Sequence, residues 1–225
     1  MCGRFTITYS YEELKKHLAQ NFKIDNFKAV FNLPRYNVAP GQEIIAIIND
    51  GSNNRVGNLK WGFLPSFAKD EKIAFSMINA KAETIDEKIA YKESFAKRRC
   101  LILADSFYEW KRVGKDKTPM RILKKDKQMF AMAGIWNTYT RNDGTKIHTC
   151  AIITTSANSL VSQVHDRMPV ILDEAYQKQW LDTTMDKVGL KTMLKPFPES
   201  EMDLYEVSSI VNNASNDKIE CINGV

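Results

Sequence analysis

Short β-prone runs separated by strong turn signals recur along most of the chain, and they limit its fold more than any other feature. An apolar run over residues 43–48 ends at Asn49-Asp50-Gly51, and residues 56–63 suit the return strand. Asn142-Asp143-Gly144 is a hairpin signal between runs at 129–136 and 146–154. Further strands are predicted at 100–104, 108–113, 120–123 and 204–211. Runs joined by such short turns favour antiparallel pairing.

Helices are predicted around these strands. Ser10 and Glu13 form a capping box, and the apolar spacing over residues 11–22 marks one helical face. Thr84 and Glu87 form a second capping box before a charged helix that reaches about residue 97. Segments 156–164 and 174–181 are also predicted to be helical. Together the patterns predict one α+β domain over residues 1–225, with largely antiparallel, barrel-like β-sheets and flanking helices.

The composition is that of an ordinary soluble protein. The 225 residues carry a net charge of +5, which permits an anionic partner such as nucleic acid but does not require one. No apolar run is long enough to span a membrane, and polar residues follow the start at once, which argues against a signal peptide. We therefore expect a cytoplasmic protein with no membrane partner, and a monomer suits this size.

Three of the four cysteines have a plain structural explanation. Cys100, Cys150 and Cys221 each lie in or beside an apolar stretch, with no Cys-x-x-Cys spacing and no paired histidine motif. We therefore expect buried, reduced thiols, no metal site and no cofactor. Cys2 differs because only Met1 precedes it.

Removal of Met1 would leave Cys2 with an α-amine and a thiol on one residue. Their reference pKa values are about 8 and about 8.5, so both groups are partly in their nucleophilic forms near neutral pH. The amine can form a Schiff base with an aldehyde, and the thiol can then close a five-membered thiazolidine ring. Ring closure is intramolecular, which is the situation in which oriented groups gain most from proximity.

Polar clusters interrupt otherwise apolar sequence at residues 35–41, 79–84, 105–110 and 164–169. Each also has a structural explanation as a turn, a helix cap, an exposed strand or a solvated loop. Glu109 lies among aromatic residues, and burial there would raise its pKa and suit a general acid or base. His165 lies in a dense polar motif and can move a proton near neutral pH. His17 and His148 are expected to be structural.

Together and in this order, the clusters form a recognisable pattern. The chain resembles the SRAP family (SOS response-associated peptidase) over almost its whole length. The resemblance is carried by Met1-Cys2-Gly3-Arg4-Phe5, Arg35-Tyr36-Asn37-Val38-Ala39-Pro40, Trp61-Gly62-Phe63-Leu64-Pro65, Asn79-Ala80-Lys81-Ala82-Glu83-Thr84, Phe107-Tyr108-Glu109-Trp110 and His165-Asp166-Arg167-Met168-Pro169, with later support from Val207, Val211-Asn212, Asn216-Asp217 and Cys221.

The resemblance implies a DNA damage and repair protein that senses and shields abasic sites in single-stranded DNA. Members of the family use the mature N-terminal cysteine to form a thiazolidine crosslink with the ring-opened sugar aldehyde. Carried over to this chain, Cys2 would supply both nucleophiles and Asn79 would position the sugar or the amine. Glu109 would transfer protons around that amine, and His165 would assist ring opening and reversal.

The resemblance also implies contacts with the DNA itself. Arg4 and Arg167 look like phosphate-contacting residues, whereas Asn37, Pro40 and Trp61 match motifs that line the DNA-binding cleft. Lys81 departs from the family, which commonly has arginine there; lysine keeps the charge but loses the bidentate fork. Other cations could contribute positive charge along the cleft but are more simply interpreted as solvated surface, namely Arg98, Arg99, Lys111, Arg112, Lys115 and Lys117.

Other function classes stay open at this stage. An N-terminal-cysteine amidohydrolase, such as a glutamine amidotransferase, would explain Cys2 but not the clusters around Glu109 and His165. A cysteine peptidase is suggested by the family name, and self-removal of Met1 and β-elimination lyase activity are related alternatives. A noncovalent single-stranded DNA-binding module would bind DNA normally without the Cys2 thiol.

Overall fold

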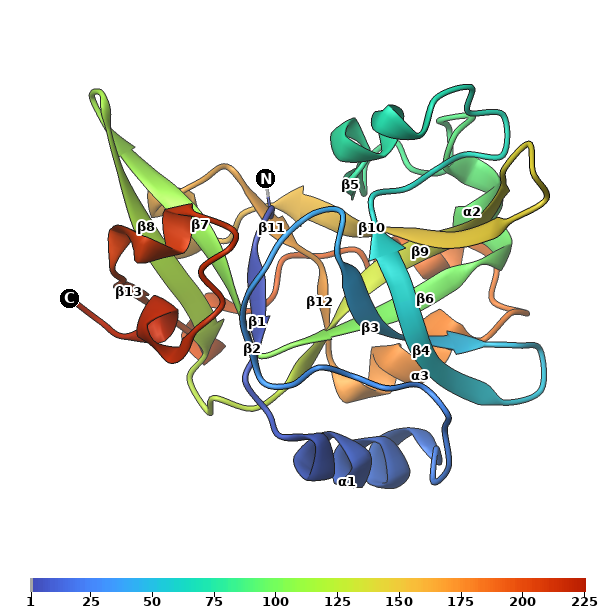
Figure 1. Ribbon diagram of the computed structural model, residues 1–225, viewed down its shortest axis with the longest axis horizontal. Helices are drawn as coiled ribbons and strands as arrows, with labels where there is room; N and C mark the ends of the chain where they lie inside the picture. Colours follow the sequence, from blue (N-terminus) through green and yellow to red (C-terminus); the bar gives the residue numbers. More distant parts are fainter. Residues whose placement is uncertain (1) are drawn as a thin grey trace.

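The computed structural model describes residues 2–225 and has a closed β-barrel at its centre (Figure 1). Neighbouring barrel strands pair antiparallel except for one parallel contact between β4 and β10. The barrel consists of β3 (Glu43–Asn49), β4 (Asn54–Trp61), β6 (Arg99–Ala104), β9 (Phe130–Thr140) and β10 (Lys146–Ser156). The predicted α+β fold with largely antiparallel, barrel-like sheets is therefore confirmed.

Three short strands extend the barrel wall, and two of them flank β10 on opposite edges and carry polar residues to it. β5 (Asn79–Lys81) runs parallel to β10 and pairs Asn79 with Ile152. β11 (Arg167–Pro169) runs antiparallel to β10 and pairs Arg167 with Ser156. β12 (Ile171–Leu172) pairs with β9. Two of the polar clusters in the sequence therefore meet on a single strand.

A second, five-stranded sheet has the order β13-β8-β7-β1-β2. Its strands are β1 (Phe5–Ile7), β2 (Arg35–Val38), β7 (Ser106–Val113), β8 (Asp116–Lys124) and β13 (Met202–Glu206). The β7–β8 ladder continues to Val113 opposite Asp116, whereas β1 pairs with β7 only at residues 106 and 107 and β13 leaves β8 at Met120. The outer part of β7 and β8 therefore projects as a two-stranded ribbon, at the upper left of Figure 1.

Alternating side chains of the barrel strands form two hydrophobic clusters. Ile45 and Ile47 belong to the cluster that also holds residues of α1 (Tyr11–Phe22) and α3 (Glu174–Leu181). Ile44 and Ala46 belong to the other cluster, which contains Cys2 and the inner residues of the five-stranded sheet. The period-two alternation of the strands therefore buries both faces of the barrel wall.

The helix predictions were right where a local signal had no tertiary competitor. The Ser10–Glu13 capping box starts α1, and α3 spans the predicted residues. The helix predicted after Thr84 was wrong: residues 82–91 form turns, and α2 is only Lys92–Lys97. The ammonium group of Lys191 binds the carbonyls of Ala82 and Glu83 and the carboxylate of Asp86, which holds this segment in its turns.

Two further predictions need correction. The segment predicted as a helix at 156–164 holds only a short 3-10 turn over Val161–Gln163, and the Val161 amide donates to the Asn158 side chain. The strand predicted at 204–211 ends at Glu206 and is followed by a 3-10 turn. The remaining helices are η1 (Glu71–Ser76), η2 (Val161–Gln163), α4 (Lys187–Thr192), η3 (Glu199–Glu201), η4 (Ser209–Asn212) and η5 (Ile219–Ile222). No helix within residues 2–225 is long and apolar enough to cross a membrane.

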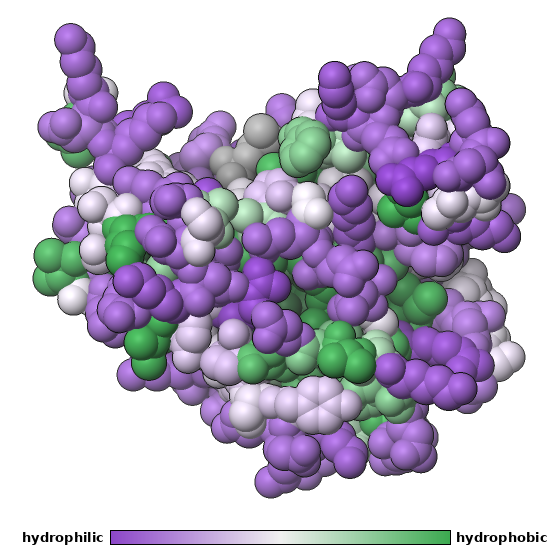
Figure 2. All heavy atoms as spheres, viewed as in Figure 1, coloured by the Kyte–Doolittle hydropathy of each residue, from purple (hydrophilic) through white to green (hydrophobic). Residues whose placement is uncertain are grey.

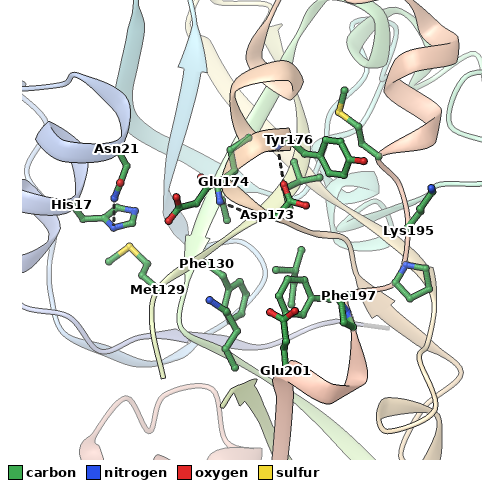
Figure 3. Close-up of a pocket in the computed structure, with 18 residues that line it drawn as sticks. His17, Asn21, Met129, Phe130, Asp173, Glu174, Tyr176, Lys195, Phe197 and Glu201 are labelled. Carbon is green, nitrogen blue, oxygen red and sulfur yellow. Dashed lines mark hydrogen bonds between the residues drawn. The ribbon is translucent and has the colours of Figure 1, made fainter. Parts of the chain in front are cut away.

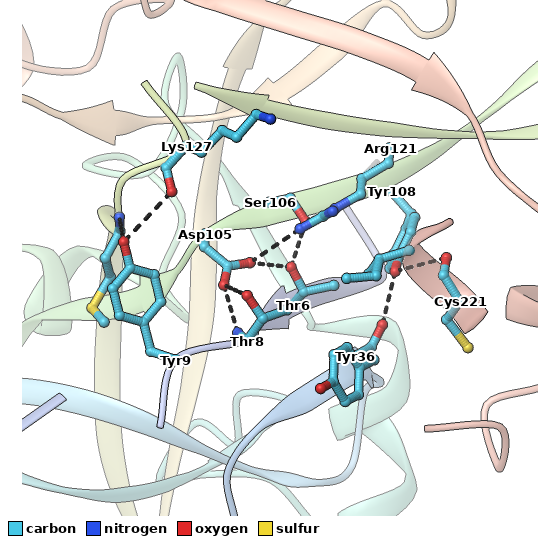
Figure 4. A network of polar contacts seen from close by, with 12 residues as sticks. Thr6, Thr8, Tyr9, Tyr36, Asp105, Ser106, Tyr108, Arg121, Lys127 and Cys221 are labelled. Atoms are coloured by element: carbon cyan, nitrogen blue, oxygen red, sulfur yellow. Dashed lines mark hydrogen bonds and ion pairs between the residues drawn. The ribbon is translucent and has the colours of Figure 1, made fainter. Parts of the chain in front are cut away.

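A buried carboxylate fastens β1 to β7 (Figure 4). Asp105 accepts hydrogen bonds from the Thr6 hydroxyl and from the amide and hydroxyl of Thr8, the last at 2.6 Å. Arg121 lies 3.7 Å away as its counter-ion and also donates to Ser106. A satisfied buried network of this kind fixes one arrangement of the strands. It therefore sets the position of β1, whose N-terminal side carries Cys2.

Candidate reactive site around Cys2

Cys2 lies just before β1 and is fully buried in the hydrophobic cluster between the barrel and the five-stranded sheet. Burial raises the pKa of its thiol well above the ordinary value, and the nearby charge of Glu109 raises it further. Burial therefore opposes the partial ionisation that the reference pKa predicts for this thiol. Its reaction requires a group that removes the thiol proton as the sulfur attacks.

Asn79 reaches Cys2 from β5. Its side-chain Nδ2 donates a 2.9 Å hydrogen bond to the Cys2 carbonyl. Its Oδ1 is buried and has no hydrogen-bond partner within residues 2–225. A buried acceptor without a donor is costly in the free protein and is available to a ligand N–H or O–H. Asn79 therefore orients the Cys2 backbone and offers one acceptor beside it.

Glu109 and His165 line one open pocket of about 380 Å³. Glu109 is only 3% exposed, and burial raises the pKa of its carboxyl group above the ordinary value. Its influence on the Cys2 thiol places the two groups within electrostatic range. The structure therefore brings Cys2, Asn79, Glu109 and His165, which are far apart in the sequence, to one site.

His165 has two neighbours at the same ring nitrogen. The backbone amide of Arg167 donates to Nδ1 at 3.0 Å, and a carboxylate oxygen of Asp166 lies 2.8 Å from Nδ1. A neutral ring accepts from the amide, whereas a protonated ring donates to the carboxylate. Nδ1 thus has a partner in either state.

Arg4 and Asn37 are engaged with the C-terminal part of the chain. Arg4 Nη1 donates to Asn37 Oδ1 at 2.8 Å and to the Val211 carbonyl at 2.9 Å, and its Nη2 lies 3.3 Å from the Asn212 carbonyl. Burial lowers the pKa of Arg4. Asn37 is fully buried, and its Nδ2 contacts the carbonyls of Val211, Asn213 and Asn216.

Asp217 completes this arrangement. Its carboxylate pairs with Arg35 and accepts from the backbone amides of Tyr36 and Asn37, the latter at 2.9 Å. We refer to residues 211–217 as the C-terminal latch. The latch holds β2 and the residue before β1 in place, so Arg4 and Asn37 act here as structural supports of the site.

Arg167 is also paired within the protein. Its Nη1 and Nη2 form a bidentate ion pair with Glu83 at 2.6 and 2.8 Å, and Nη2 donates to the Thr154 carbonyl at 2.6 Å. The Arg167 side chain is 14% exposed. A phosphate contact by Arg167 then requires it to exchange partners. Lys81, the last residue of β5, is exposed.

Trp61 has no surface to offer a ligand. It is 1% exposed, its ring centroid lies 5.2 Å from that of Phe5, and its Nε1 donates to the Ile78 carbonyl. Trp61 therefore packs in the core against Phe5 and supports β1. Pro40 is partly exposed beside Gly41, where an added Cβ would lie 3.2 Å from the ring of Phe75.

Sequence reasoning missed several residues of the site. Phe75 is 67% exposed beside the Pro40–Gly41 turn, an aromatic position that only the tertiary contact reveals. The pocket of Glu109 and His165 is also lined by Trp110, Arg112, Lys117 and Asn212, to which the sequence assigned no role in the site. Asn212 Oδ1 accepts from Trp110 Nε1 at 2.7 Å. In the sequence these positions are an aromatic residue and basic residues in a strand. Many solvated strands have the same composition, so it does not indicate a site.

Another pocket, of about 370 Å³, shares no lining residue with this site (Figure 3). It lies between α1, β9, α3 and the segment that leads to η3, and His17 forms a 3.0 Å hydrogen bond with Asn21 at its edge. Within residues 2–225, no group of three or more His, Cys, Asp or Glu side chains is arranged to hold a metal ion.

The comparisons with known proteins agree with one another. A sequence model described as SOS response associated peptidase (SRAP) matches residues 1–214. The abasic site processing protein YoqW of Bacillus subtilis is 46% identical, with 99% of each chain covered. The abasic site processing protein HMCES of Xenopus tropicalis is 29% identical, with 99% of this chain and 78% of that protein covered. A crystal structure of a protein from Bacteroides thetaiotaomicron has a TM-score of 0.87 at 25% identity, with 100% of both chains covered.

Proposed function

Because the chain belongs to the SOS response associated peptidase (SRAP) family, we propose that it captures abasic sites in single-stranded DNA as a covalent adduct. Relatives named abasic site processing proteins support the DNA lesion as the target. The observation that carries the chemistry is the meeting of Cys2, Asn79 and the Glu109–His165 pocket. The proposed product is a thiazolidine between mature Cys2 and the sugar aldehyde.

Thiazolidine formation needs only Cys2 and the sugar aldehyde as reactants. The Cys2 α-amine, free once Met1 is removed, adds to the C1′ aldehyde of the open sugar, and loss of one water gives the imine. The thiol then adds across the carbon–nitrogen double bond. One carbon–sulfur bond forms, and the thiol proton moves to nitrogen. The net change is the loss of one water from the two partners.

Glu109 suits both proton transfers. Its raised pKa favours the protonated carboxyl group, which can donate to the oxygen that leaves as water. The resulting carboxylate can accept a proton from the buried Cys2 thiol, which stays protonated until the imine is in place. One side chain thus acts first as an acid and then as a base.

His165 serves the preceding step. An abasic sugar is mainly a closed hemiacetal, so the anomeric hydroxyl must lose a proton while the ring oxygen gains one. The neighbours of Nδ1 allow the imidazole to hold either protonation state, and Nε2 exchanges the proton with the sugar. Asn79 Oδ1 receives the Cys2 amine or a sugar hydroxyl.

The surface around the site suits a single strand with one base missing. Pro40 and the exposed ring of Phe75 form an apolar surface that can stack beside the gap in the bases. Lys81 is an exposed cation that can meet a neighbouring phosphate. Arg4 and Asn37 bind the C-terminal latch, and Trp61 packs against Phe5 of β1. We propose that the protein acts as a monomer.

Mass spectrometry of the mature protein with single-stranded DNA carrying one abasic site tests the proposal. The expected adduct has the summed mass of both partners less one water. A tetrahydrofuran analogue, which has no aldehyde, is the matched control and should give no adduct. An unshifted protein mass, with Met1 shown to be absent, would sink the proposal.

A second experiment separates the two nucleophiles. Cys2→Ser keeps the amine and should form an imine that borohydride traps, but no adduct that survives heating. Equal durability of the Cys2→Ser and wild-type adducts would contradict thiazolidine formation. Shortened DNA would indicate β-elimination, and release of ammonia from glutamine would favour the amidohydrolase alternative.

A further inference from the structure

The β7–β8 ribbon places two cations directly opposite each other. Arg112 on β7 pairs in register with Lys117 on β8. Like charges at directly opposed positions of an antiparallel pair are destabilising. The two residues are paired near the outer end of the ladder, where neither β1 nor β13 covers the strands. The ribbon therefore holds a repulsive pair in the free protein.

No acidic side chain within residues 2–225 forms an ion pair with Arg112 or Lys117. The acid nearest in the ribbon is Asp116, which pairs in register with Val113. Both cations are exposed. Figure 2 shows this projecting part of the molecule as a polar arm that rises beside a hollow. The repulsion is thus left for a ligand to relieve.

Both cations line the pocket that holds Glu109 and His165. A third donor group lies at the same pocket. Because Trp110 Nε1 can only donate, the atom of Asn212 that lies 2.7 Å from it is the carbonyl oxygen. The Nδ2 group of Asn212, with two N–H donors, is therefore directed away from Trp110. A guanidinium, an ammonium and an amide thus surround one side of the pocket.

We propose that Arg112 and Lys117, assisted by Asn212, form a phosphodiester-binding subsite for the DNA backbone next to the lesion. The inference rests on the proposed function, which makes DNA the ligand. A nucleotide whose sugar reaches Glu109 and His165 carries a phosphate on each side. Arg112 and Lys117 are the two cations that line this pocket, and a guanidinium grips phosphate oxygens in a bidentate manner. Phosphate binding also removes the repulsion across the ribbon.

Salt-dependent binding to the tetrahydrofuran analogue tests the subsite without the covalent step. For single strands, each lost phosphate contact reduces the slope of log K against log salt by about 0.7. Arg112→Ala and Lys117→Ala should each weaken binding and reduce the slope by about this amount. Lys115→Ala removes the same charge from the ribbon tip, outside the pocket, and should leave the slope unchanged. Equal slopes for Arg112→Ala, Lys117→Ala and wild type would overturn the subsite.

Charge reversal separates binding from folding. Arg112→Glu creates an opposite-charge pair with Lys117, so its urea midpoint should equal or exceed that of the wild type. Its affinity for DNA should nevertheless fall further than that of Arg112→Ala. Unchanged affinity in Arg112→Glu would show that Arg112 does not meet phosphate and would overturn the proposal.

The outcome is independent of the crosslinking chemistry. If wild type never crosslinks to abasic DNA but Arg112→Ala lowers the salt slope, the phosphate subsite stands and the proposed reaction fails. If wild type crosslinks and the slope does not depend on Arg112 or Lys117, the reaction stands and the subsite fails.

Discussion

The C-terminal latch and the β7–β8 ribbon use basic residues in opposite ways. At the latch, Arg4 donates to two backbone carbonyls and to Asn37, and Asp217 neutralises Arg35. On the ribbon, Arg112 and Lys117 face each other, and no residue in the described part of the chain forms an ion pair with them. The first region uses positive charge to hold the protein together. The second leaves it available.

The difference shows that a basic residue in a recognisable motif need not be the one that meets the ligand. A phosphate that recruits Arg4 must compete with acceptors already in place, and those acceptors would lose their donor in a partly buried site. A phosphate that recruits Arg112 displaces water and relieves repulsion. We therefore expect latch residues to govern stability and ribbon residues to govern DNA affinity.

The largest expected effect lies at Glu109, which belongs to β7 and lines the pocket next to the ribbon. Glu109→Gln removes the proton donor and acceptor while keeping the shape of the side chain. Crosslinking should slow by about 100- to 10,000-fold, the usual contribution of a general acid–base group. Adduct formation over time on a denaturing gel measures it. A wild-type rate would remove Glu109 from the reaction.

The same substitution has a pH-dependent effect on stability with a defined sign. Burial raises the pKa of Glu109 in the folded state, so between its unfolded and folded pKa values the folded protein binds more protons. The contribution of Glu109 to stability is therefore lost as the pH rises through this window. Glu109→Gln should exceed wild type in urea midpoint above the window. A lower midpoint there would show that the carboxylate stabilises the fold.

Asn37→Ala tests the latch. The substitution removes the side-chain donor of the Asn213 and Asn216 carbonyls and the Oδ1 acceptor of Arg4, so the free energy of unfolding should fall by about 3 kcal/mol. Urea denaturation measures this loss. Lys115→Ala on the ribbon is the control and should change stability by less than about 0.5 kcal/mol. A larger loss of stability in Lys115→Ala than in Asn37→Ala would show that the ribbon, and not the latch, governs stability.

Arg167 tests whether a paired arginine can be recruited by DNA. Because Glu83 and Thr154 occupy its guanidinium, Arg167→Ala should leave the salt slope of DNA binding nearly unchanged. Glu83→Gln loosens the pair and should raise affinity modestly. A reduction of the slope by about 0.7 in Arg167→Ala would show that Arg167 exchanges Glu83 for phosphate.

The smallest expected effect is at Lys81, an exposed cation on β5. Lys81→Arg restores the bidentate fork and should tighten binding of single-stranded DNA by roughly twofold, in the range of an exposed ion pair. Lys81→Ala is the matched loss, and anisotropy titrations measure both. Identical affinity and salt dependence in wild type and Lys81→Ala would exclude a DNA contact at this position.

Most of the strands were predictable because their signals are local. The turn at Asn49-Asp50-Gly51 joins β3 to β4, and the turn at Asn142-Asp143-Gly144 joins β9 to β10, as their sequences indicate. The helix after Thr84 failed because Lys191, about a hundred residues later, holds that segment in turns. A capping signal is worth about 1 kcal/mol, and tertiary contacts readily exceed it.

The residues of the candidate site also divide into those that a sequence pattern identifies and those that only contacts between distant residues reveal. The sequence identified Cys2, Asn79, Glu109 and His165 because their order along the chain is characteristic, and the structure brings them together. It could not identify Trp61 as a buried residue of the core, since an aromatic side chain in a motif suits a cleft equally well. Nor could it distinguish Arg112 and Lys117 from any solvated ribbon.

The sequence by itself determined the reactive pair of amine and thiol at Cys2, the family of the chain and the antiparallel strands, because each depends on residue type or short spacing. Only the tertiary structure decided that the Cys2 thiol is buried, which raises its pKa, and which cations form no ion pair within residues 2–225. The acceptor that engages Arg4 at Val211 lies 207 positions away. Pairing over such distances depends on chain folding, so local composition does not encode which charges stay available for a ligand.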